Sequence, residues 1–179
     1  AVVIELTLHN TLATDVDKEI KLQMNGGVTK NTADWANWIP PMENGNSQTF
    51  DKGRNSILFS SKIGDAHLLQ GLDCFVDEIN RFGIIKKISV PSGKKVKIFY
   101  FAVLGEKVAK VQAIFDLLKS RKESLLNENR NYWDNEIKSV FDMDNPTYSG
   151  SLPILITGNK SIEKLYHMGI MGVIYFRRD

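Results

Sequence analysis

The segment at residues 106–141 constrains the fold most, because it contains neither glycine nor proline. Its apolar residues fall mostly three or four apart, with charged residues between them, at Val108, Val111, Phe115, Leu118, Leu125 and Leu126. This spacing is typical of an amphipathic helix and predicts one at about residues 106–128. Four asparagines between positions 127 and 135 weaken the pattern, so we expect a break near residues 129–131 before a further turn or two around Trp133.

Most of the remaining chain predicts strands. In "VVIELTLHN" apolar residues alternate with other residues, which is the period of a half-buried strand, and residues 20–24 repeat the alternation. The polar residues between these two segments predict a hairpin. We expect a second hairpin around residues 91–93, and further strands at "NSILFSS", "LPILITG" and "GIMGVIYFRR". The segment at residues 65–82 fits either a helix or a strand around Cys74.

Several strand-like segments and one long helix together predict an α+β, β-rich fold, with an antiparallel sheet or β-sandwich and a single long amphipathic helix. The length of 179 residues is that of one ordinary domain, so we expect residues 1–179 to form a single domain. Hydrophobic residues make up 42% of the chain and charged residues 25%, close to the averages of globular proteins. The composition therefore indicates neither disorder nor a coiled coil.

The net charge and the cysteine count limit the classes of binding partner and the cellular compartments that fit this chain. The formal net charge of +2 lacks the basic excess of most nucleic-acid-binding proteins, so we expect no nucleic acid partner. A single cysteine, Cys74, forms no intramolecular disulfide. Polar residues interrupt the first ten positions, unlike a signal peptide, and no stretch approaches the ~20 apolar residues of a transmembrane helix. We expect a cytoplasmic chain as synthesised, with later release or secretion as the open alternative.

Catalytic chemistry has one candidate cluster, which consists of Asp65, His67, Asp73 and Cys74. A thiolate beside an imidazole is a nucleophile in some enzymes. We favour a buried thiol near a surface histidine, because cysteine is among the most buried residue types. The paired ligand spacing of a zinc site is missing. We therefore expect no catalytic residues, no metal and no cofactor, and keep an enzyme that uses Cys74 and His67 as a third hypothesis.

The segment "DWANWIPPMENGNSQTF", residues 34–50, is the main candidate for a binding site. Trp35 and Trp38 have the three-residue spacing of one helical face, and two prolines then end regular structure. The rings either plug the core, stack on sugars while amides bind the hydroxyls, or anchor the chain at a membrane interface. Tyr132 and Trp133 form a second aromatic pair. The predicted ligand-binding residues are Trp35, Trp38, Asn37, Asn44, Asn46, Tyr132 and Trp133.

The sequence thus predicts a non-enzymatic binding protein whose partner is a membrane lipid or a glycan. In general architecture such a chain is similar to small cytolysins and sandwich lectins, an analogy of fold alone. In the membrane version, the helix leaves the sheet and lies in the lipid interface. The alternative is a protein-interaction module, such as an inhibitor, an immunity protein or a self-assembling subunit, and a homo-oligomer belongs to this alternative.

Overall fold

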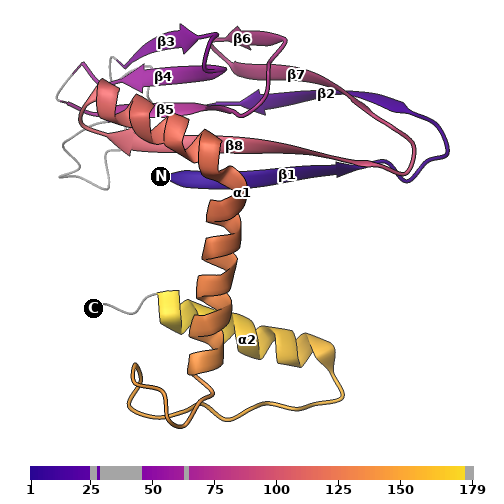
Figure 1. Ribbon diagram of the computed structural model, residues 1–179, viewed down its shortest axis with the longest axis vertical. Helices are drawn as coiled ribbons and strands as arrows, with labels where there is room; N and C mark the ends of the chain where they lie inside the picture. The colour runs from indigo at the N-terminus through magenta and orange to yellow at the C-terminus, as the bar shows by residue number, and fades with distance from the viewer. Residues whose placement is uncertain (25–27, 29–45, 63–64, 176–179) are drawn as a thin grey trace. The chain divides into compact units, whose positions relative to one another are not determined.

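The computed structural model describes residues 1–24, 28, 46–62 and 65–175. The chain forms two compact units, Ala1–Lys122 and Glu123–Asp179. The first unit contains the strands and the first part of helix α1 (Val108–Ser139), and the second contains the rest of α1 and helix α2 (Lys160–Tyr175) (Figure 1). The expectation of a single domain stays a prediction.

The strands of the first unit form two antiparallel sheets. They are β1 (Val2–His9), β2 (Val16–Gln23), β3 (Ser47–Asp51), β4 (Ser56–Ser60), β5 (His67–Leu72), β6 (Glu78–Asn80), β7 (Gly83–Val90) and β8 (Lys95–Gly105). The five-stranded sheet has the order β1-β8-β5-β4-β3 and the three-stranded sheet has the order β2-β7-β6. The predicted α+β, β-rich fold with antiparallel sheets and one long helix is therefore confirmed.

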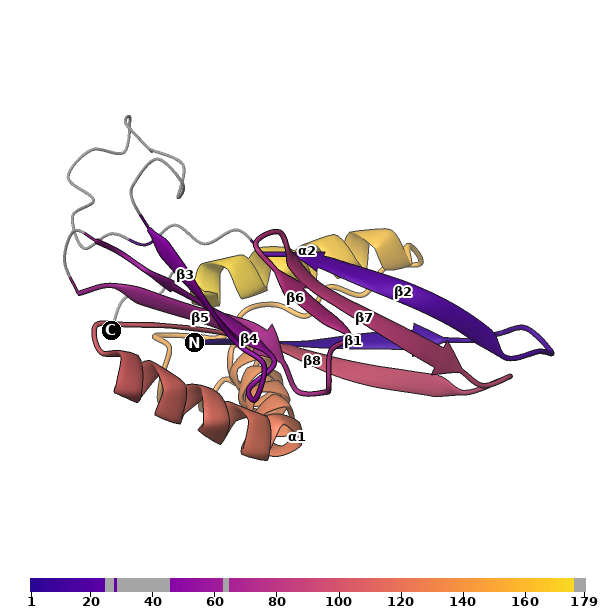
Figure 2. The ribbon, with the colours of Figure 1, turned by 90° about the horizontal axis from the view of Figure 1, so that it is seen from above.

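One hydrophobic core joins the two sheets. Ile57, Phe59 and Ile98 of the five-stranded sheet belong to the same buried cluster as Ile84 and Ile88 of the three-stranded sheet. Figure 2 shows the strands of the two sheets running side by side when they are viewed from above. Burial of one face of each sheet in a shared core is the arrangement of a β-sandwich.

The five-stranded sheet is also covered on its other face, by the first part of α1. Phe115 of α1 is fully buried, and its ring meets the ring of Phe101 edge-on at 5.6 Å between centroids. Gly71 of β5 makes room for this contact, because a Cβ there would lie 2.9 Å from Cζ of Phe115 and 2.6 Å from the carbonyl oxygen of Asn55. Burial on both faces explains why β4 and β8 are apolar along most of their lengths instead of alternating.

Ion pairs fasten the same part of α1 to the strands. Arg54, in the turn between β3 and β4, donates to Asp51 at 2.8 Å and to Asp116 of α1 at 3.2 Å. Lys122 donates to Asp73, whose other carboxylate oxygen accepts a backbone hydrogen bond from β8. Because Arg54 binds two carboxylates from different elements, it fixes the helix relative to the β3–β4 turn.

Both predicted hairpins are wrong, since β1 pairs with β8 and β2 pairs with β7. The segments at residues 10–15 and 91–94 instead cross from one sheet to the other. Asn10 holds this corner together: its side-chain amide donates to the carbonyl oxygens of Thr14 and Val90, at 2.8 and 2.9 Å. The second segment does contain a tight turn, with a hydrogen bond from Lys94 N to Pro91 O of 3.0 Å, but the strands on either side enter different sheets.

The predicted break in the helix is also wrong, because α1 is continuous from Val108 to Ser139. Each asparagine lowers helix stability by less than ~1 kcal/mol relative to alanine, which tertiary packing overrides. Packing is present on both sides of the asparagines: Val111 and Phe115 are buried in the first unit, and Trp133 and Ile137 pack against the core of the second.

The two strands predicted near the C-terminus are wrong as well. The segment "LPILITG" forms no regular structure, and the described part of "GIMGVIYFRR" belongs to helix α2. Asn159 starts this helix, because its side-chain oxygen accepts a hydrogen bond from Ser161 N at 3.0 Å. Between residues 65 and 82, which the sequence left open, the described residues form β5 and β6.

Candidate functional site

Most of the predicted aromatic site lies outside the described residues. This holds for Trp35, Trp38, Asn37 and Asn44, so their roles stay predictions. Asn46 is described, is partly buried and directly precedes β3.

The second aromatic pair is described and lies in the second unit. Tyr132 and Trp133 are neighbours on α1, and their rings meet edge-on at 5.8 Å between centroids. Trp133 packs against a buried cluster of Val140, Ile170 and Ile174, whereas Tyr132 is 52% exposed. Trp133 therefore contributes to the interior of this unit, and Tyr132 is the member of the pair that solvent reaches.

The geometry around Cys74 and His67 does not form a nucleophile with its base. His67 begins β5, and its Nδ1 atom lies 2.9 Å from Oγ of Ser60. The length of β5, roughly 17 Å for five residue steps, separates His67 from the end of the strand that precedes Cys74. Burial, and then the charge of Asp73, raise the pKa of the Cys74 thiol above its ordinary value of 9.0. A protonated thiol is a poor nucleophile.

Among the described residues, no three histidine, cysteine or acidic side chains are grouped so that they could hold a metal ion. Likewise, neither α1 nor α2 has the length and apolar character needed to cross a bilayer.

The most unusual feature of the described residues is the apolar surface of the second unit. Six large apolar side chains of α2 are exposed, and we call them together the α2 surface: Ile162, Leu165, Met168, Met171, Val173 and Tyr175. Val173 is 76% exposed and Leu165 is 70% exposed. The preceding segment adds Ile154 and Ile156, at 71% and 86%. Monomeric proteins rarely leave large apolar side chains exposed in such a continuous group.

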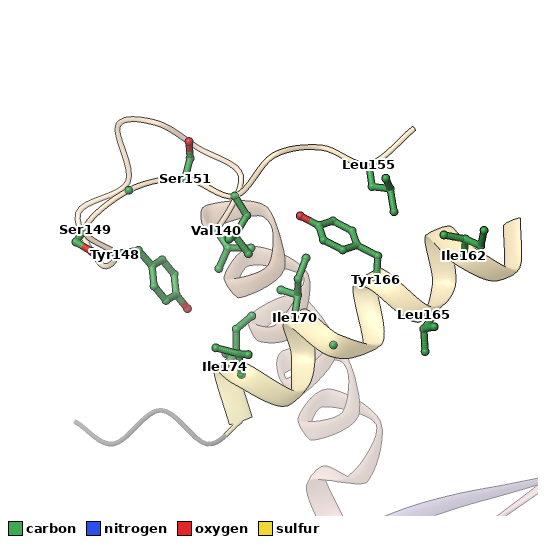
Figure 3. A pocket seen from close by; sticks show the side chains of 14 residues that line it. Val140, Tyr148, Ser149, Ser151, Leu155, Ile162, Leu165, Tyr166, Ile170 and Ile174 are labelled. Atoms are coloured by element: carbon green, nitrogen blue, oxygen red, sulfur yellow. The ribbon is translucent and has the colours of Figure 1, made fainter. Parts of the chain in front are cut away.

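A hollow of about 870 Å³ lies beside this surface, between α2 and the segment that precedes it. Figure 3 shows Tyr166 and Ile170 of α2 facing the loop that carries Tyr148 and Leu155. Hydrogen bonds hold the loop in place: the hydroxyl of Tyr166 donates to the carbonyl oxygen of Pro153 at 2.6 Å, and the hydroxyl of Tyr148 donates to Glu136 at 3.0 Å. The loop is therefore fixed beside the helix, and the hollow keeps a mostly apolar lining.

The charged residues of α2 are Lys160, Glu163 and Lys164, all within its first five residues. Glu163 accepts hydrogen bonds from Lys160 Nζ at 2.6 Å and from Thr157 N at 3.1 Å, and these two contacts lower the pKa of its carboxyl group. From Leu165 to Tyr175 the sequence contains no aspartate, glutamate, lysine or arginine. In the sequence this absence of charge does not distinguish a buried element from an exposed one, and the segment was predicted to be a strand.

No protein-family model matches the chain, and no curated protein sequence matches it.

Proposed function

We propose that this chain is a protein-interaction module, and that its contact surface is the α2 surface. The observation that carries the proposal is the exposure of large apolar side chains over most of the circumference of α2. From Leu165 to Tyr175, both the packed side of α2 and much of its solvent side carry apolar residues. Apolar helix surface of this extent is normally covered by protein or by lipid. Because α2 has neither the length nor the apolar character of a spanning helix, contact with another protein surface is the environment that fits it best.

The composition of α2 favours protein over lipid as the partner. Helices that lie in a membrane interface combine one apolar face with a polar face rich in lysine and arginine. Between Leu165 and Tyr175, α2 offers no such charged face to lipid headgroups.

Release of α1 onto a membrane is also opposed by its packing. Val111 and Phe115 are fully buried against the five-stranded sheet. Release would expose Phe101, which Phe115 covers, to water at a cost of roughly 1.5–3 kcal/mol. The ion pairs of Asp116 and Lys122 would be broken at the same time.

Binding of lipid or glycan by the tryptophan segment is the second candidate function. The observation behind it is the spacing of Trp35 and Trp38 before two prolines, together with the asparagines that follow. In this candidate the indole rings contact the ligand, and the asparagine side chains bind hydroxyl or headgroup oxygens.

Site-specific photo-crosslinking tests the proposed function. A photoreactive residue replaces Leu165 on α2 in the full chain, and the matched control carries the same residue at Leu117, which is 52% exposed on α1. We expect protein adducts from position 165 and far fewer from position 117. Sedimentation with anionic vesicles and tryptophan emission are measured in parallel. Vesicle binding with a blue shift, without protein adducts at position 165, would replace the proposal by the membrane candidate.

A further inference from the structure

Two glycines of α2 lie between larger side chains, and we call the space above them the α2 groove. With 3.6 residues per turn, Leu165, Gly169 and Gly172 follow one another along one side of α2. A Cβ atom at either glycine would meet no other atom within 4 Å, so both positions border open space. Met168 and Tyr175 lie to one side of this line and Ile162 and Val173 to the other. Small residues flanked by larger ones allow two helix backbones to approach closely.

The extent of the surface matches what a stable protein contact requires. Met171 lies on another side of the helix, and the other five side chains of the α2 surface present on the order of 600 Å² to solvent, against about 800 Å² per partner in a standard interface. At 16 residues, α2 is roughly 24 Å long, so a second helix of the same length covers the groove from end to end.

The charges of the chain permit contact between two copies. Lys160 and Glu163 pair with each other at 2.6 Å, so the first turn already has its own ion pair. Lys164 follows this pair and lies about 100° round the helix from Leu165, and residues 165–175 contain no aspartate, glutamate, lysine or arginine. The net charge of +2 gives little repulsion between whole chains. An uncharged surface presents no like-charge contacts when it meets its own copy.

We propose that α2 packs against α2 of a second copy of this chain, so that the protein is a homodimer with a two-fold axis through the α2 surfaces. The proposal rests on the proposed function and names its partner. In a two-fold interface the same patch is used by both subunits. Each helix lies over Gly169 and Gly172 of the other, the flanking side chains Met168 and Val173 enclose the contact, and Leu165 lies at one end of it.

Sedimentation velocity of the full chain at roughly 100 μM, well above a micromolar Kd, tests the proposal directly. We expect a discrete dimer. Leu165→Glu will weaken dimerisation about 100-fold or more, because each interface would bury two carboxylates in apolar surroundings. Leu117→Glu is the matched control on α1 and will leave the dimer unchanged. A wild-type monomer, or a dimer that Leu165→Glu does not weaken, overturns the proposal.

Gly172→Leu distinguishes specific helix packing from non-specific hydrophobic association. Unlike Leu165→Glu, it introduces no buried charge. The added side chain enlarges the exposed apolar area but fills the groove. If copies associate only because α2 is apolar, the variant will associate more strongly than the wild type, which overturns the proposal. If the helices pack through the groove, we expect dimerisation to be at least about tenfold weaker. Far-UV circular dichroism checks that each variant keeps its helices.

The two proposals fail in distinguishable ways. A wild-type chain that is monomeric when purified, but whose position 165 crosslinks to a different protein in a cell extract, refutes the homodimer and leaves the interaction module standing. A chain that is monomeric when purified and gives no protein adduct at position 165 in a cell extract refutes both. A dimer whose position 165 crosslinks to its own copy supports both.

Discussion

Truncation of Phe115 to alanine is the sharpest test of how α1 is held on the sandwich. Phe115 is fully buried, meets Phe101 edge-on at 5.6 Å, and lies over the space left by Gly71. Removal of a fully buried phenylalanine ring costs about 3–5 kcal/mol of stability, through lost hydrophobic transfer and the cavity that remains. The free energy of unfolding of a whole domain is about 5–15 kcal/mol, so the variant will lose a large part of it.

Urea unfolding of the full chain, followed by circular dichroism, measures this loss. Leu117→Ala is the matched control, because Leu117 is on the same helix but 52% exposed, and leucine and alanine have similar helix propensities. We expect the control to lie within about 0.5 kcal/mol of the wild type. A loss below about 1 kcal/mol in Phe115→Ala would show that the ring does not hold α1 on the sheet.

The remaining predictions concern two ionisable groups. Burial raises the pKa of Asp51, but the hydrogen bonds and charge of Arg54 outweigh burial, so this pKa lies below its ordinary value of 3.8. A lowered folded-state pKa contributes stability above the unfolded-state value, and the contribution is lost as the pH falls through the folded-state value. Asp51→Asn will therefore flatten the fall of Tm below about pH 4, and equal slopes for both chains would contradict this. The raised pKa of Cys74 predicts that a thiol reagent at neutral pH modifies the folded chain at least about tenfold more slowly than the urea-unfolded chain. Equal rates would show that Cys74 is accessible to the reagent and deprotonated in the folded chain.

The sequence predicts many individual strands and the helix of the first unit, but it does not predict which strands pair with each other. The alternation of β1 and the spacing of α1 were visible because each element buries a face with its own period. Pairing was not visible, since polar residues after a strand are needed equally in a hairpin and in a corner between two sheets. Asn10 illustrates this, because its amide binds the carbonyl oxygen of Val90, far along the chain.

The second unit was mispredicted for a different reason. The four-residue period of α2 is present, but Leu165, Met168 and Met171 between the positions of this period are also apolar, so the segment resembles a continuous apolar run. Its valine, isoleucine and tyrosine residues then favoured a strand. The four-residue spacing of Ile162, Tyr166, Ile170 and Ile174 and the cap at Asn159 were the signals that pointed to a helix. The α2 surface as a candidate site was not predictable, because exposure depends on how the unit folds.

The pairing of β1 with β8 has a consequence for synthesis on the ribosome. Val2 lies opposite Ala102, so β1 cannot pair with β8 until the ribosome has added about a hundred further residues. At 5–20 residues per second this takes roughly 5–20 s, while hairpins close within microseconds. During that interval the nascent chain carries an unsatisfied β-strand that is open to wrong partners. A chaperone that shields the nascent N-terminal segment would therefore raise the yield of correctly folded chains.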